Sequence, residues 1–474
     1  MALSDAQWLA WLEDESKDAV ILVEANYYDT TEKTLYISDS GYIDPEDVDA
    51  PNYLAVITSD VVIDDQLGEV GFSDIVFTNY DDAILDYQFV GFVVKIFYGD
   101  RSWPRDDFRQ KGYTRTDDFT SPDPFSYQLK LLNSSVRYFD QLIQVQTSSG
   151  DNIGLPFVLG SPTNITPRRE DTTTYILYTP AVSLTTNFVV RDQGVVLTIT
   201  TDYTISYEGE DVDAAGYKYA INLVATPNGE ITCDPVSASA ADNDLSAIIE
   251  SLSDYLANPI VVDSSVIGFD GKELGYLLTD FTRLGDVLSD LCHSFGANPR
   301  VNQNGELSVV QINVPGTPTR TINSLLSDMS LIKREAKARG LVVGYQKNWT
   351  IQSTNLAGSL SATDYYKWGV EYYFRVGFWL TSLAEYPFET PIERGTAITN
   401  FTDATTEFNR LNTILGSERR RFEFEADVSS VYDDLGDTVE IVYEHFGLSE
   451  GDDFVVIGNQ QNLSKKTCKV TVWH

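Results

Sequence analysis

The closing stretch of the chain decides the fold. Residues 432–443 read YDDLGDTVEIVY, residues 445–451 read HFGLSEG, and residues 468–473 read CKVTVW. Val439, Ile441 and Tyr443 occupy alternate positions, which is typical of a strand with one buried face. The turns between such strands are supplied by glycines, at Gly436, Gly447, Gly451 and Gly458. The pattern predicts the end of a small antiparallel barrel.

Length and composition indicate a folded, multidomain protein. A chain of 474 residues is too long for one core and should divide into roughly three or four domains. A hydrophobic content of 42% and an aromatic content of 12% exclude a disordered chain. No apolar run approaches the ~20 residues that span a bilayer, and the start at Met1 lacks the features of a secretory signal.

The cysteines and histidines offer little for catalysis or metal binding. The three cysteines, Cys233, Cys292 and Cys468, are odd in number and far apart, so we expect buried thiols and assembly in a reducing cytoplasm. Neither they nor the three histidines show the spacing of a zinc or calcium motif. We therefore predict no metal, no cofactor and no catalytic residue.

The net charge of −38 argues against a surface that grips nucleic acid, because such binding needs lysine and arginine to displace counterions from phosphates. A conduit along which DNA slides without sticking fits the charge, and so does plain solubility. Two short basic runs, 333–339 and 419–421, stand out on this background. The run 333–339 could contact DNA, but an intersubunit salt-bridge surface is favoured on so acidic a chain. The run 419–421 should pair with nearby acidic groups or with a neighbouring copy.

The first part of the chain reads as a helix followed by strands. Ser4 and Gln7 form a capping box before an apolar face at Trp8 and Leu12. Strands are expected at 19–25, 34–38 and 91–98. A W-P-x-D-D-F phrase at 103–108 follows, whose Trp103 and Phe108 could stack on a ligand but are expected to plug the end of a barrel.

The middle of the chain changes character twice. Residues 155–235 predict a small β-domain with strands bounded by turns. Helical periodicity then appears at 244–256 and 284–295, followed by a hairpin with its turn at Asn304 and Gly305. Cys292 lies beside the apolar stripe of the second helix, which favours core packing over a nucleophile.

Several of these phrases together resemble phage tail hub proteins, also called baseplate hub proteins. They are the opening at 4–14, the W-P-x-D-D-F phrase, the L-G-D-x-V strand, the H-F-G-L-S-x-G centre and the closing K-V-T-V-W. The family-motif positions in this sequence are Trp103, Pro104, Asp106, Asp107, Phe108, Leu435, Gly436, Asp437, Gly447, Leu448 and Trp473. The resemblance is weakest from 346 to 400.

The resemblance implies a mainly β chain with an α/β insertion: two tail-tube-like antiparallel β-barrels, a small β-domain and a helix-hairpin unit. The expected sections are 1–135 (N-terminal helix and first barrel), 136–240 (β-rich insertion), 241–318 (helix-hairpin) and 319–474 (second barrel with the C-terminal strands). Three such chains would form a ring of six barrels.

The implied function is structural. The homotrimer would sit at the tail tip of a virion assembled in the host cytoplasm, continuing a sixfold tail tube and presenting threefold symmetry. The distal tail or tail tube protein would lie above it and central fibre or tip proteins below. DNA would pass without specific binding, and the chain would not insert into a membrane. Around a DNA channel, both basic runs should face neighbouring subunits or other tail proteins.

Two alternatives remain open. An adhesin would bind a receptor or glycan through residues 155–235 or the aromatic stretch 365–379. A hub with built-in peptidoglycan hydrolase activity would need a metal constellation or a paired-carboxylate cleft.

Overall fold

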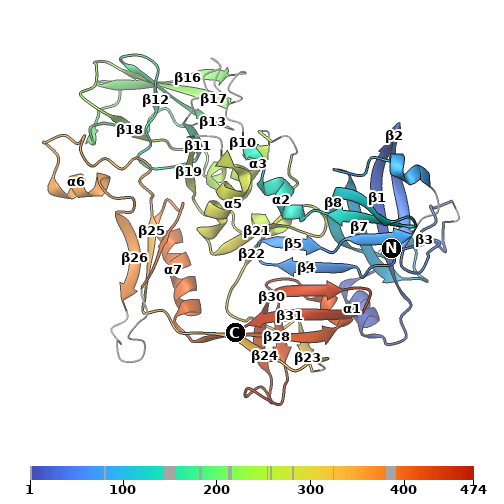
Figure 1. Ribbon diagram of the computed structural model, residues 1–474. Coiled ribbons are helices and arrows are strands. Elements are labelled where there is room, and N and C mark those ends of the chain that lie inside the picture. The colour runs from blue at the N-terminus through green and yellow to red at the C-terminus, as the bar shows by residue number, and fades with distance from the viewer. Residues whose placement is uncertain are drawn as a thin grey trace. The chain divides into compact units, whose positions relative to one another are not determined.

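The computed structural model describes residues 3–47, 49–78, 82–143, 156–180, 184–211, 216–253, 255–256, 259–279, 282–323, 325–379 and 391–474. Strands outnumber helices throughout (Figure 1). A mainly β fold class is therefore confirmed, whereas the two barrels remain a prediction.

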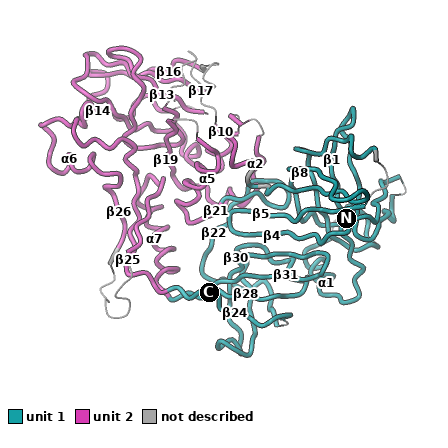
Figure 2. Tube along the Cα trace, in the orientation of Figure 1, with its two compact units in different colours: residues 1–137, 299–335, 418–474 teal, residues 138–298, 336–417 magenta. Residues whose placement is uncertain are grey.

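The chain forms two compact units, each built from separated stretches (Figure 2). Unit 1 comprises 1–137, 299–335 and 418–474, and unit 2 comprises 138–298 and 336–417. The unit boundary after residue 298 falls inside the expected helix-hairpin section. The four consecutive sections stay a prediction.

Unit 1 begins with helix α1 (Asp5–Glu13), whose capping box is confirmed: the Ser4 N–H donates to Gln7 Oε1 at 3.0 Å. Its first sheet has the order β3-β2-β1-β7-β8-β9-β6. The strands are β1 (Ala19–Asp29), β2 (Thr31–Ser38), β3 (Leu54–Ala55), β6 (Ile75–Thr78), β7 (Val93–Asp100), β8 (Arg109–Asp123) and β9 (Ser126–Leu131), with 3₁₀ turns η1 (Asp82–Asp86) and η2 (Arg105–Asp107).

One run of chain joins the two edges of this sheet. β3 pairs with β2, and the residues directly after it bond to β6 at the opposite edge. The Thr78 N–H donates to the Val56 carbonyl at 2.9 Å, and the Thr58 N–H donates to the Val76 carbonyl at 2.8 Å. The sheet is therefore curled, with its first and last strands brought together.

The second sheet of unit 1 is made mostly from the C-terminal stretch. Its order is β23-β29-β30-β31-β28-β24. The strands are β23 (Arg320–Ile322), β24 (Ser330–Glu335), β28 (Arg419–Asp427), β29 (Thr438–Ile441), β30 (Asp452–Asn462) and β31 (Thr467–Trp473), with the 3₁₀ turn η4 (Val428–Tyr432). Leu325, three residues after β23, bridges Ala426 of β28, the strand next to the far edge.

A hairpin from the N-terminal part completes the second sheet. β4 (Val62–Gln66) and β5 (Glu69–Phe72) pair with each other, and β4 also pairs with β30 from Val62↔Asn462 to Gln66↔Gly458. The hairpin of β21 (Ala297–Val301) and β22 (Leu307–Gln311) has its predicted turn, with Gly305 at φ +82°.

The two sheets of unit 1 share one hydrophobic core. It includes Ile21 and Val23 from β1 together with Phe422, Val470 and Val472 from the C-terminal strands. The intervening β1 residues Val20 and Leu22 face a second, aromatic cluster on the other side of the first sheet. The alternation predicted from the sequence is confirmed in these strands, and both faces of β1 are covered.

Unit 2 combines small sheets with helices. The largest sheet has the order β16-β17-β13-β11-β19, and β12 pairs with β13. A three-stranded sheet has the order β15-β14-β18, and another has the order β26-β25-β27. The strands are β10 (Leu142–Ile143), β11 (Phe157–Gly160), β12 (Arg168–Arg169), β13 (Thr174–Thr179), β14 (Val189–Asp192), β15 (Val195–Val196), β16 (Tyr203–Asp211), β17 (Gly216–Leu223), β18 (Ile231–Asp234), β19 (Gly275–Leu278), β20 (Thr282–Arg283), β25 (Gly340–Tyr345), β26 (Phe374–Trp379) and β27 (Ile392–Gly395).

The predicted helical stripes of unit 2 are confirmed as buried faces. The helical segments are η3 (Ala240–Asn243), α3 (Leu245–Ser253), α4 (Ser264–Ile267), α5 (Leu284–His293), α6 (Ala362–Trp368) and α7 (Phe401–Leu415), while α2 (Ser134–Phe139) crosses the unit boundary. Leu245, Ile248 and Leu252 of α3 and Leu284 and Leu288 of α5 are buried. Among the described residues, no helix is long and apolar enough to cross a membrane.

Candidate functional site

Trp103 of the W-P-x-D-D-F phrase belongs to an aromatic group at the start of unit 1. Its ring centroid lies 4.7 Å from that of Trp11 and 5.9 Å from that of Trp8, both on α1. The Tyr42 hydroxyl donates to the Trp103 carbonyl at 2.7 Å, and the Trp11 indole N–H donates to Asp100 at 2.8 Å. These contacts fasten the N-terminal helix to the end of β7.

Phe108 closes the other side of the same turn. Its ring is buried and lies so near Gly99 that a Cβ built on this glycine would be 2.6 Å from Phe108 Cδ1. Tyr42 stacks edge-on against it, with centroids 5.0 Å apart. Glycine at 99 is therefore required by close packing and not by its backbone angles.

The remaining motif positions surround Arg105, which occupies the variable place of the phrase. Arg105 donates to Glu24 at 2.7 Å and to the Tyr53 hydroxyl at 2.9 Å, and its guanidinium lies 3.5 Å from the centroid of the Phe97 ring. Pro104 precedes the 3₁₀ turn η2. Asp106 is exposed, and Asp107 has one buried carboxylate oxygen without a hydrogen-bond partner among the described residues.

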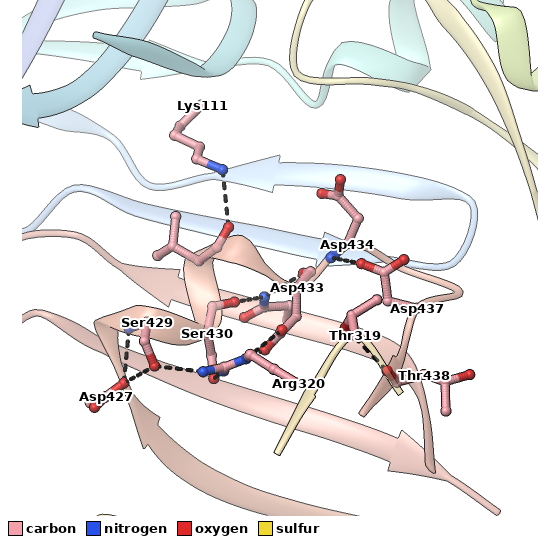
Figure 3. Close-up of polar contacts among 12 residues, drawn as sticks. Lys111, Thr319, Arg320, Asp427, Ser429, Ser430, Asp433, Asp434, Asp437 and Thr438 are labelled. Atoms are coloured by element: carbon pink, nitrogen blue, oxygen red, sulfur yellow. Dashed lines mark hydrogen bonds and ion pairs between the residues drawn. The ribbon is translucent and has the colours of Figure 1, made fainter. Parts of the chain in front are cut away.

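A buried ion pair between Arg320 and Asp433 lies close to the L-G-D turn at 435–437, from which Figure 3 shows Asp437. Arg320 and Asp433 form two parallel bonds of 2.7 Å, from Nε to Oδ1 and from Nη2 to Oδ2. Arg320 also donates to the Ser429 and Ser430 hydroxyls at 2.8 and 2.6 Å. The Arg320 side chain is 10% exposed and that of Asp433 is fully buried, so the pair joins β23 to η4 in a dry environment.

The electrostatics of this network are dominated by burial. Burial raises the pKa of Asp433 despite its bonds to Arg320. Burial also raises the pKa of Asp437 to about 6, although its carboxylate accepts a bond from the Asp434 N–H at 3.0 Å. The turn therefore holds two acidic groups that ionise less readily than free aspartate.

A buried lysine connects the two motif regions. Lys111 lies on β8, three residues after Phe108, and its ammonium donates to the Val431 carbonyl at 3.0 Å. Burial lowers the pKa of this amine, while the charge of Asp434 acts in the opposite direction. Nearby, Asp65 and Arg300 form a buried ion pair at 2.6 Å, and burial raises the pKa of Asp65 to about 6.

The last motif positions are packed or placed at turns. Leu435 and Leu448 are buried, Gly436 and Gly447 adopt φ of +95° and +81°, and Trp473 is 6% exposed in β31. A left-handed φ explains glycine at both turns. All eleven motif positions thus belong to unit 1, and their assembly role stays a prediction.

The sequence reasoning missed the charged residues that hold the motifs in place: Glu24, Asp65, Arg105, Lys111, Arg300, Arg320 and Asp433. They are single polar residues within strands and turns. The one sequence signal was an arginine or lysine interrupting a strand pattern. A basic residue in a strand is buried only where an acidic partner meets it, and the sequence does not show which residue that partner is.

The basic run 419–421 pairs within unit 1. Arg419 and Arg421 lie 3.3 and 3.2 Å from Glu335 of β24, and Arg420 lies 3.6 Å from Asp452. Pairing with nearby acidic groups, one of the expected alternatives, is therefore confirmed. Arg334 of the other run makes a two-pronged contact with Glu418 at 2.6 and 2.8 Å.

The cysteines are free and buried, as predicted. Cys292 is fully buried with the apolar side chains of α5, which confirms its packing in the core, and burial raises the pKa of its thiol to about 12. Within the described ranges, no group of three His, Cys, Asp or Glu side chains could hold a metal ion. A polar depression of about 340 Å³ on the second sheet of unit 1 is lined by both Glu423 and Glu425, but Lys469 pairs with Glu423 at 2.8 Å.

Aromatic side chains of the stretch 365–379 are partly exposed in unit 2. Tyr365 and Tyr366 on α6 are 45% and 61% exposed. The Tyr366 ring lies 6.1 Å from that of Tyr373, which in turn lies 5.1 Å from that of Phe374. The exposure that the adhesin alternative requires is present at these positions.

No protein-family model matches the chain, and no curated protein matches it in sequence. Solved structures that the chain is similar to include prophage tail protein gp18 from Listeria monocytogenes EGD-e, at 10% identity and a TM-score of 0.45, covering 96% of this chain and 94% of that one. The 43 kDa tail protein of prophage MuSo2 from Shewanella oneidensis is 9% identical, with a TM-score of 0.43, and 96% and 98% are covered. A tail protein from Neisseria meningitidis MC58 is 8% identical, with a TM-score of 0.40 and 96% of both chains covered.

Proposed function

We propose that the chain is a structural hub of a phage tail tip. Three copies form a ring that continues a sixfold tail tube, presents threefold symmetry to tip proteins, and encloses part of the DNA path. The observation that carries the proposal is the arrangement of unit 1. Two sheets, the first of them curled, share one core, and each bears one group of hub-like motifs.

Two sheets per chain supply the count that the ring requires. In the first sheet a single run, residues 54–58, lies along both edges; in the second, β23 pairs with β29 and Leu325 bridges Ala426 of β28. In the first sheet such self-joining leaves few free edges, as a barrel does, whereas β24 is an open edge of the second. Three copies would then provide six barrel-like elements, matching a sixfold tube above.

The charge supports a passive DNA path. DNA carries one negative charge per ~1.7 Å of its axis, so a basic wall would hold it through many contacts at once. The chain instead carries a net −38, and the basic runs pair with carboxylates such as Glu335 and Glu418. Carboxylates lining the ring would repel DNA over about 8 Å at physiological salt. A map of the assembled ring with a basic lumen would remove this part of the proposal.

The direct experiment is the mass of the assembly, in solution by light scattering and in the particle. A trimer is expected. A chain that stays monomeric at every concentration and is missing from particles would overturn the proposal. A murein zymogram tests the hydrolase alternative, and clearing by the purified chain would favour it.

The exposed tyrosines Tyr365 and Tyr366 favour one second candidate, a glycan-binding role for unit 2. Aromatic rings with hydroxyl groups can stack on sugars and bond to them. Glycan-array binding that disappears in a Tyr366→Ala variant would establish this role beside the structural one.

A further inference from the structure

Unit 1 carries an exposed apolar and basic surface along one edge of its second sheet. Among the described residues, β24 pairs only with β28, and its Leu331 and Ile332 are 42% and 53% exposed. Lys333 and Arg334 follow, and both side chains are more than half exposed. Leu331 shares the face of Phe422 and Phe446, whereas Lys333 shares the opposite face with Arg421, so these residues lie on the two sides of the edge strand. We call this rim of the sheet, with Arg421 and Phe446, the basic edge.

Phe446 belongs to this surface and is held there by an unusual backbone. Its φ is +60°, a left-handed angle that is rare for a bulky side chain. The ring is 45% exposed and lies 5.2 Å from that of Phe422, the residue that pairs with Leu331 across β24 and β28. Phe446 and Gly447, both at left-handed angles, are the central residues of a tight turn in which the Leu448 N–H donates to the His445 carbonyl at 3.2 Å, and this turn holds the ring beside β28.

The basic edge is positive on a strongly negative chain. Five basic side chains share three carboxylates there: Lys333, Arg334, Arg419, Arg420 and Arg421 pair with Glu335, Glu418 and Asp452. The net charge of the whole chain is −38. A local excess of cations is therefore complementary to most other surfaces of a second copy.

A second surface of unit 1 has apolar side chains with acidic neighbours. Tyr28, Leu85 and Val90 are 50%, 56% and 44% exposed at one end of the first sheet, beside the exposed carboxylates Glu32 and Asp86. Two basic side chains lie at the same end: Lys33 pairs with Asp29 at 2.8 Å, and Arg115 donates to the Gly91 carbonyl at 3.1 Å. We call this surface the acidic end. It is held firmly, because Tyr28 and Gln88 exchange backbone bonds of 2.9 and 3.0 Å and Tyr27 stacks on Tyr87 at 4.6 Å.

We propose that the basic edge of one copy docks on the acidic end of the next copy. This contact rests on the proposed ring and specifies which surfaces close it. Each surface has an apolar centre and a charged rim, as protein interfaces do. A self-pairing contact would bring like charges together, whereas a head-to-tail contact pairs opposite charges and generates a ring when the rotation closes.

Side chains make this contact, without an added strand. The register between β24 and β28 shifts between Leu331 and Lys333, so Ile332 is bulged. A bulge and basic residues on an edge strand oppose indiscriminate strand pairing. The same features leave Leu331, Ile332 and Phe446 available to an apolar partner such as Leu85.

Disulfide trapping tests the contact directly. The three native cysteines are buried, so introduced thiols react alone. A chain carrying both Ile332→Cys and Leu85→Cys should give, on oxidation, a ladder that ends in a closed ring. Each single variant should stay uncrosslinked, and a mixture of the two should give dimers only. Dimers from either single variant would show a self-pairing contact and overturn the proposal.

Charge exchange gives an independent readout. The Lys333→Glu/Arg334→Glu and Glu32→Lys/Asp86→Lys variants should each weaken association at least tenfold, and the four changes together should restore it. Lys465→Glu, an exposed charge change in the turn between β30 and β31, is the control, and circular dichroism should show every variant folded. If both charge-reversed variants still form trimers as well as wild type does, this contact is refuted but the proposed ring is not. If the wild-type chain never associates, the contact and the ring are both refuted.

Discussion

Replacing Arg320 by methionine tests the buried pair close to the L-G-D turn. The change removes four hydrogen bonds and leaves the Asp433 carboxylate without a cation in a site where its side chain is fully buried. Breaking a buried pair in this way typically costs about 3–5 kcal/mol. We expect the free energy of unfolding of the Arg320→Met variant to fall by that amount.

A double substitution separates the pair from the packing around it. When both charges are replaced by apolar residues of similar volume, the cost is commonly small or reversed. We therefore expect Arg320→Met/Asp433→Leu to be more stable than either single variant, with a coupling energy of about 2–3 kcal/mol. Lys469→Met is the control, because its 2.8 Å pair with Glu423 is largely exposed and should contribute less than about 1 kcal/mol.

Urea unfolding followed by tryptophan fluorescence measures these differences, since Trp8, Trp11, Trp103 and Trp473 all belong to unit 1. Single variants that lose less than about 1 kcal/mol, as surface pairs do, would refute the reasoning. So would a double variant whose loss equals the sum of the two single losses.

Three further predictions concern the motif positions. Gly99→Ala should lower the free energy of unfolding by about 1–3 kcal/mol, because the added Cβ would meet the Phe108 ring. Gly71→Ala should be nearly neutral in the same unfolding experiment, because the added Cβ would lie 3.6 Å from its nearest neighbour, Asp64 Cβ. Equal effects of the two changes would contradict the packing. The folded pKa of Asp437 is about 6 against 3.8 unfolded, so its charge costs stability above pH 6 and this cost disappears as the pH falls towards 4. The Asp437→Asn variant should therefore be more stable than wild type by about 1 kcal/mol at pH 8, after allowance for partial exposure, and equally stable near pH 4. A stability difference that does not change with pH would contradict the raised pKa of Asp437. The Trp473→Ala variant should lose about 3–5 kcal/mol of its free energy of unfolding and fail to enter particles. Trp103 is half-buried, so Trp103→Ala should lose less stability but should also fail to assemble. Normal incorporation of either variant would show that its ring is dispensable.

Local features of the fold could be predicted from the sequence. The capping box at Ser4 and Gln7, the turn at Gly305 and the buried stripes of α3 and α5 each depend on residues within a few positions of one another. Periodicity and turn chemistry act over that range. The same applies to the burial of Cys292, which lies beside an apolar stripe.

Long-range pairings could not be predicted in this way. Arg320 and Asp433 are 113 positions apart, and Asp65 and Arg300 are 235 apart. Nothing in the neighbourhood of either residue indicates its partner, because the pairing depends on which strands meet. The motif phrases indicated where the chain is specialised, and these charged partners explain how the phrases are held.

The attachment of the β4–β5 hairpin to β30 has a consequence for synthesis in the cell. Val62 pairs with Asn462, so this sheet of unit 1 cannot be completed until almost the whole chain has left the ribosome. Until then the first hundred residues carry apolar strands with an unfinished core, a state prone to aggregation. We expect nascent chains and C-terminal truncations to depend on chaperones, and the last strands to act as the quality check that admits only full-length chains to assembly.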